Sequence, residues 1–278
     1  MKYLLSTFRD KIAQCVLFSL VIMLVILGYL YNEIPKTIYV EEYTFLTYMS
    51  DILYGKCFPY ILILLISMPM MLHFFSIEMV CTKFDYLIIQ RTGIHNFYNQ
   101  EKLKSFFRGF LLGIILNVFI LFLIWAVHPS NKISLLSSLT NGTSKQSRNP
   151  FIEIGINILL QSIGIGIVNV GLFMLTRFRP NKYFFYLSLL LVTVAISTGV
   201  VVVFALITTV FPSFNNFIPF LIPIFSIFNP LSLLFPSYDL FLIPYSNLLK
   251  FIGSTIVYLV LIWWGSKKMI EYEKVGKI

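Results

Sequence analysis

Long runs of apolar residues, separated by short polar segments, dominate the pattern along this 278-residue chain. A membrane-spanning helix needs roughly 17 to 25 mostly apolar residues, because the hydrocarbon core of a bilayer is about 30 Å thick. Six runs fall in that range or slightly beyond it, with approximate bounds 12–31, 57–76, 107–127, 151–176, 183–211 and 248–264. The pattern therefore predicts an all-α polytopic membrane protein with six transmembrane helices in a single domain, 1–278.

Two segments do not fit a simple span. Residues 1–11 mix apolar and charged side chains, which is typical of a helix lying at the membrane interface. Residues 212–245 are strongly apolar but contain six of the 12 prolines, which interrupt helical hydrogen bonding. We expect short re-entrant helices in 212–245, because a single kinked seventh span would carry Lys267 and Lys268 to the opposite side of the membrane.

The segment between spans two and three, 78–108, has charged residues at both ends and an apolar middle that is too short to span. Gly93 follows Arg91 and Thr92 and is a natural helix stop. The pattern predicts a short helix at the inner membrane surface, then a new helix that begins between Ile94 and Asn99 and runs into span three. An ordinary amphipathic loop that lies along the membrane explains the composition equally well.

Composition and charge support the membrane assignment. The chain is 58% hydrophobic and 12% charged with a mean hydropathy of +0.85, which leaves too few charges to cover a water-soluble surface. With a cytoplasmic N-terminus, 15 of the 21 Lys and Arg residues fall on the cytoplasmic side. The positive-inside rule then places both termini in the cytoplasm, and the net charge of +9 indicates anionic lipids as partners and not nucleic acid.

The sequence has no recognisable catalytic or metal-binding motif. His73, His95 and His128 are far apart, and no HExxH, GxSxG or GxxxxGK[ST] pattern is present. We therefore expect no enzyme activity and no cofactor site in this chain. His73, alone within span two, is expected to be a hydrogen-bonded packing residue.

The spans do contain neutral polar and small residues. Four candidates for a substrate path or a dimer interface lie in spans three and four: Asn117, Asn157, Gln161 and Asn169. Hydrogen bonds between helices are the simpler role for these side chains. Pairs of small residues four positions apart, which allow close helix packing, occur at Gly109 and Gly113, Ser162 and Gly166, and Ala195 and Gly199.

Taken together, these features resemble the permease subunit of a type 2 ATP-binding-cassette (ABC) exporter, especially permeases for peptide or bacteriocin export and immunity. The family's local pattern is an acidic residue, a Tyr-Leu-x-x-x-Arg-x-Gly-like stretch and a lysine, matched here by Glu78, Tyr86, Leu87, Arg91, Gly93 and Lys102. Many family members have a second basic residue just after the glycine. This chain has Ile94 and His95 there, so no salt bridge is carried over to that position.

The resemblance implies that a helix between Phe84 and Gly93 couples the permease to a separate cytoplasmic ATPase subunit. The residues implied in ATPase coupling are Glu78, Phe84, Asp85, Tyr86, Leu87, Arg91, Gly93 and Lys102. ATP and Mg²⁺ would bind to that ATPase, and the permease would pair with a second copy or a paralogous permease. Spans one, two and five would line the path between the two permeases.

By the same resemblance, the protein would lie in a bacterial plasma membrane and export an amphipathic or antimicrobial peptide, or a lipid-like substrate, by alternating access. The alternative is a stand-alone membrane immunity or binding protein that acts without an ATPase. A channel is less favoured because the spans lack rings of charge or a filter sequence. Stable association with an ATPase would distinguish the exporter from these alternatives.

Overall fold

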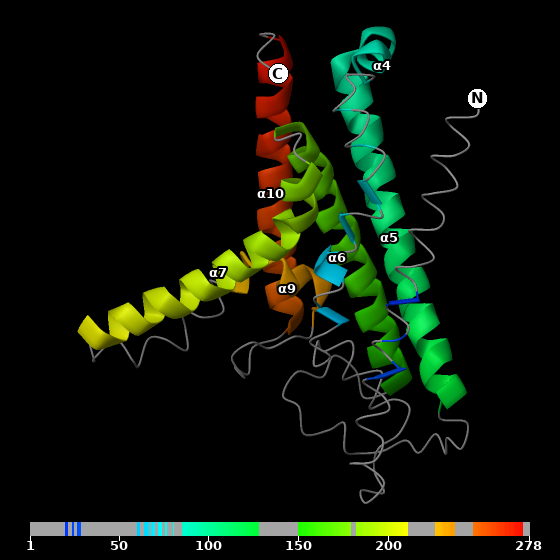
Figure 1. Cartoon of the computed structure of the whole chain (residues 1–278), viewed down its shortest axis with the longest axis vertical. Coiled ribbons are helices and arrows are strands. Elements are labelled where there is room, and N and C mark those ends of the chain that lie inside the picture. Colours follow the sequence, from blue (N-terminus) through cyan, green and yellow to red (C-terminus); the bar gives the residue numbers. More distant parts are fainter. Residues whose placement is uncertain are drawn as a thin grey trace, which may run out of the picture.

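The computed structural model describes residues 85–127, 150–178, 182–210, 226–236 and 247–274, together with scattered positions between 20 and 80. These residues are almost entirely helical, which confirms the all-α prediction (Figure 1). The elements are α4 (Asp85–Thr92), α5 (Ile94–Val127), α6 (Pro150–Phe178), α7 (Lys182–Val210), α9 (Leu231–Leu234) and α10 (Asn247–Lys274). The predicted interfacial segment 1–11 and most of spans one and two lie outside the described residues.

Four of the described helices are long and apolar enough to cross a bilayer, so the protein has the character of a membrane-embedded chain. Their candidate spans are Ile94–Leu123, Ile154–Arg177, Phe184–Ile207 and Leu248–Glu271. They correspond to the predicted spans three to six. The full count of six spans stays a prediction.

The last helix is longer than the apolar run that predicted it. The run ends near 264, whereas α10 continues to Lys274. Beyond the apolar part, Lys268 Nζ lies 3.0 Å from Glu271 Oε2, an i,i+3 pair on the helix surface. Charged residues with good helix propensity therefore extend α10 past the hydrophobic stretch.

Helices α5 and α6 form the most extensive pairing among the described elements, and small residues make it possible. A Cβ placed on Gly109 would lie 2.8 Å from Asn169 Cβ, and one on Gly113 would lie 2.8 Å from Ser162 Cα. The pairs 109/113 and 162/166 therefore face each other within one chain, which confirms the close helix packing predicted for them. The third pair, Ala195 and Gly199, shows no such close packing, because a Cβ on Gly199 would have no neighbour within 4 Å.

Residues 226–236 form a turn and the short helix α9, which is packed against α6 and α10. Leu233 and Leu234 are fully buried. Gly164 of α6 permits this contact, since a Cβ there would collide with the Leu233 carbonyl. The described part of 212–245 thus contains a short helix, while the predicted re-entrant arrangement and its location in the outer leaflet stay predictions.

Helix α7 diverges from the other long helices (Figure 1). Phe185, Ser188 and Leu189, near its start, are buried. Beyond Thr193, the described side chains of α7 are exposed or only partly buried. Because most of these side chains are apolar, this part of α7 presents a largely hydrophobic surface to its surroundings.

Candidate functional site

Helix α4 is a separate short helix because Gly93 interrupts the helical conformation between α4 and α5. Gly93 has φ 78°, in the left-handed region that costs other residues about 1 kcal/mol. The Gly93 amide donates to the Ile89 carbonyl at 2.8 Å, and Thr92 Oγ1 donates to the Ile88 carbonyl at 2.9 Å. These bonds end α4, and α5 begins at Ile94, as predicted. In Figure 1, α4 lies at the end of the bundle beside the start of α5.

One side of α4 is anchored to the bundle through a small apolar cluster, which we call the end cluster. Ile89 is 8% exposed and belongs to it, while Ile88 packs against its edge. The buried members of the end cluster are Ile89, Phe97, Tyr98, Phe173, Met174 and Met269. Helix α4 packs chiefly against α5, and the end cluster continues from there to residues of α6 and α10.

The other side of α4 is polar and accessible. Gln90, Arg91 and Thr92 are exposed, and so are His95 and Asn96 on the first turn of α5. We call these five residues the polar face. It is close in sequence and in space to the end cluster, so a partner that docks on the polar face would press on a helix already packed against the bundle.

The buried guanidinium of Arg177 holds the end cluster together from the end of α6. Its Cζ lies 5.3 Å from the ring centroid of Phe97, 5.6 Å from Tyr98 and 5.9 Å from Phe173. Arg177 is only 6% exposed. A cation over aromatic faces is stabilised by each ring, and more so when water is excluded. The contact therefore links the end of α6 to the first turn of α5, the turn that follows α4.

A second link at this end of the bundle includes α10. Lys102 Nζ donates to Ser266 Oγ at 3.3 Å, and Ser266 Oγ lies 3.8 Å from Met174 Sδ. The three residues belong to α5, α10 and α6. The helix ends behind α4 are thus connected by polar contacts as well as by apolar packing.

Of the residues implied in ATPase coupling, the structure places Arg91 on the polar face and Gly93 at the break. The backbone of Asp85, Tyr86 and Leu87 is helical in α4, whereas Glu78 and Phe84 lie outside the described residues. Lys102 lies about two turns into α5 and bonds to α10, away from the polar face. The sequence did not predict the buried position of Arg177, which was treated only as one of the basic residues that favour a cytoplasmic location. The features that could have indicated it are a basic residue at a helix end and an aromatic pair, Phe97 and Tyr98, at the start of another helix.

The four polar candidates inside the helices are all buried, at 3% exposure or less. Asn169 Nδ2 donates to the Ser105 carbonyl of α5 at 2.6 Å, which is the expected bond between helices. His73 Nε2 lies 3.0 Å from the Asn169 carbonyl oxygen, so this histidine makes the expected hydrogen bond. Asn117 Nδ2 bonds to the Gly113 carbonyl within its own helix at 2.8 Å. A role for Asn117, Asn157, Gln161 and Asn169 in a substrate path or dimer interface stays a prediction.

Among the residues that the structure describes, no group of three His, Cys, Asp or Glu side chains could hold a metal ion.

No protein-family model matches the chain, and no curated protein or solved structure is significantly similar to it. Fold and site together define a class: a helical membrane protein with a short helix anchored at one end of its bundle.

Proposed function

We propose that this chain is the transmembrane subunit of an ATP-driven ABC exporter in a bacterial plasma membrane. In this proposal the chain has six spans and cytoplasmic termini, works with a second permease, and exports an amphipathic or antimicrobial peptide or a lipid-like molecule. A separate cytoplasmic subunit binds ATP and Mg²⁺ and hydrolyses the nucleotide.

The observation that supports the proposal best is the construction of α4. It is an eight-residue helix, set off by Gly93, whose inner side is fixed by Ile89 and whose outer side is polar and accessible. A short helix presented in this way can dock through its polar side on a soluble partner of complementary charge. A loop that merely lies along the lipid would not need a side chain buried in the bundle, as Ile89 is.

The end cluster supplies a physical route from such a partner to the membrane helices. Displacing α4 would move Ile89, a member of a packed cluster whose other residues come from α5, α6 and α10, and tightly packed side chains do not compress. The helices would therefore shift as units, as alternating access requires.

The distribution of charge supports the proposed orientation. Basic residues are concentrated at the α4 end, where α5 begins and where α6 and α10 end: Arg91, Lys102, Lys104, Arg177, Lys267 and Lys268. By the positive-inside rule this end faces the cytoplasm, which is where an ATPase subunit would dock.

The decisive experiment is purification of the tagged full chain from its native host in mild detergent, with mass spectrometry of co-purifying proteins and an ATP hydrolysis assay. We expect a stoichiometric protein with Walker motifs. Its retention should fall at least about tenfold in Arg91→Glu and Leu87→Asp, because a reversed or buried charge at a docking helix costs 1.4 kcal/mol or more. Gln100→Glu, at an exposed position of α5 beyond the polar face, is the control and should retain the partner.

Reproducible purification of the chain without any ATPase, even after crosslinking, would overturn the exporter and favour the stand-alone binding or immunity protein. Equal retention of the ATPase by wild type and both α4 variants would leave the exporter standing and remove α4 as its docking helix.

A further inference from the structure

A second feature lies on the side of the bundle from which α7 diverges. A cavity of about 380 Å³ opens between α6, α7, α10 and the turn at 226–236. None of the described residues that line it is charged. Its two hydroxyl groups are directed to backbone carbonyls, since Ser188 Oγ donates to Phe185 at 2.6 Å and Tyr258 OH donates to Phe228 at 3.0 Å. The cavity therefore favours an apolar guest.

The cavity has the dimensions of a site for a chain-like molecule. Its wall follows α10 from Tyr258 to Gly265 and α7 from Ser188 to Ile196, a length of roughly 10 to 12 Å along each helix. Its volume falls in the usual range for ligand sites, about 300 to 1,000 Å³. All three lining helices are candidate membrane spans, so in a bilayer lipid acyl chains would reach the opening.

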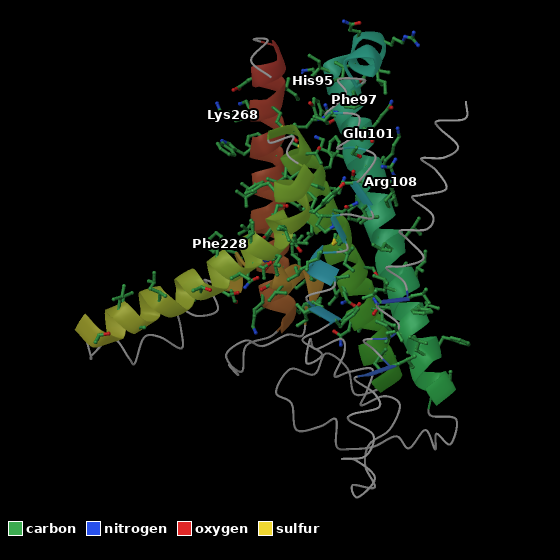
Figure 2. All side chains as sticks on the ribbon, viewed as in Figure 1. His95, Phe97, Glu101, Arg108, Phe228 and Lys268 are labelled. Carbon is green, nitrogen blue, oxygen red and sulfur yellow. The ribbon has the colours of Figure 1, made fainter. Side chains whose placement is uncertain are left out.

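One end of the cavity has a basic side chain beside it. Leu261 and Gly265 line the cavity, and Lys268 is the next residue on the same face of α10. The Cα–Cβ bond of a helical residue is tilted toward the helix N-terminus, which for Lys268 is the direction of the cavity. Figure 2 shows Lys268 and Phe228 on the same side of α10, the side on which α7 leaves the bundle. In the structure Lys268 Nζ lies 3.0 Å from Glu271 Oε2, with both side chains about half exposed, so an anion bound at Lys268 would share the ammonium group with this carboxylate.

We propose that this cavity is a binding site for an anionic phospholipid. The acyl chain enters between α7 and α10, and the phosphate lies at Lys268. The site is independent of the exporter proposal, because it requires only that these helices span a membrane.

The test uses a photoactivatable lipid and the full chain reconstituted in vesicles. The probe is phosphatidylglycerol with a diazirine on one acyl chain, in a phosphatidylcholine background, and labelled peptides are mapped by mass spectrometry. We expect labelling centred on Val192, Ile196 and Leu261. Gly171→Leu places a side chain in the cavity, because Gly171 lines it and a Cβ there has no neighbour within 4 Å, and it should reduce this labelling to the level of the outer face of α7.

Gly155→Leu is the matched control, since Gly155 is also open, lies on the same helix and is not part of the cavity wall. It should leave the labelling unchanged. If Gly171→Leu does not fold, Val192→Phe fills the cavity from α7 instead. Lys268→Gln should lower labelling by phosphatidylglycerol about fivefold, because one lysine contributes about 1 kcal/mol to binding an anionic lipid, and should not affect a phosphatidylcholine probe.

Three results would overturn the proposal. The first is labelling that is equal in wild type and the cavity-filling variants. The second is equal labelling by the two headgroups with no effect of Lys268→Gln. The third is a crosslink between two copies of the chain at Val192 or Leu261 that excludes the lipid probe.

Discussion

At the scale of single residues, Arg177 shows how one side chain acquires a structural role that its charge alone does not indicate. It lies in the last turn of α6, where a basic residue is favoured by the helix dipole and by the positive-inside rule. Neither the helix dipole nor the positive-inside rule requires the side chain to be buried. The structure instead buries it over the rings of Phe97, Tyr98 and Phe173, so its removal should loosen the contact between α5 and α6.

A double-mutant cycle tests this contact. We expect Arg177→Met and Phe97→Leu to be coupled by about 1 kcal/mol in the free energy of unfolding in detergent, because the cation loses a stacked ring. Arg108→Met combined with Phe97→Leu is the control pair. Arg108 is exposed and about three turns farther along α5, so its effect should be additive; a coupling no larger than that of the control pair would refute the role given to Arg177.

At the scale of elements, the break at Gly93 determines whether α4 exists as a separate helix. Gly93→Val should destabilise the break, since a β-branched residue is strained at φ 78°, whereas Gly93→Asn should be tolerated because asparagine adopts this conformation most readily. Hydrogen exchange of the backbone amides of 89–97 provides the measurement. Faster exchange in the valine variant only is the expected result, and identical exchange in both variants would show that the left-handed turn is not required.

The sequence predicted those features of the described helices that depend on neighbouring residues in the chain. Gly93 fixed the end of α4 and the start of α5 to within a few residues, because a glycine stop acts on its own neighbours. The end of α10 was missed by about ten residues, since its charged final turns are helical without being apolar. The divergence of α7, the partners of Arg177 and the facing of 109/113 against 162/166 depend on contacts between segments distant in sequence. No single run of residues encodes those contacts.

At the scale of the whole molecule, the arrangement of helix ends makes a prediction about topology. With Cys15, Cys57 and Cys81 replaced, Arg91→Cys and Lys268→Cys should react with a membrane-impermeant maleimide from the cytoplasmic side only. Asn247→Cys, at the opposite end of α10, should react from the outside only. Labelling of all three positions from one side would be incompatible with α10 as a transmembrane helix.

The pairing of α5 with α6 also has a consequence for how the chain is made. Helix α6 carries the buried amides Asn157, Gln161 and Asn169, which are costly to expose to lipid, whereas α7 has no charged or amide side chain after Lys182. Ribosomes synthesise α5 before α6, so the helix that needs a partner leaves the translocation machinery when its partner is already in the bilayer. Helix α7, which follows α6, needs no such partner and is stable in the lipid before the later segments are inserted.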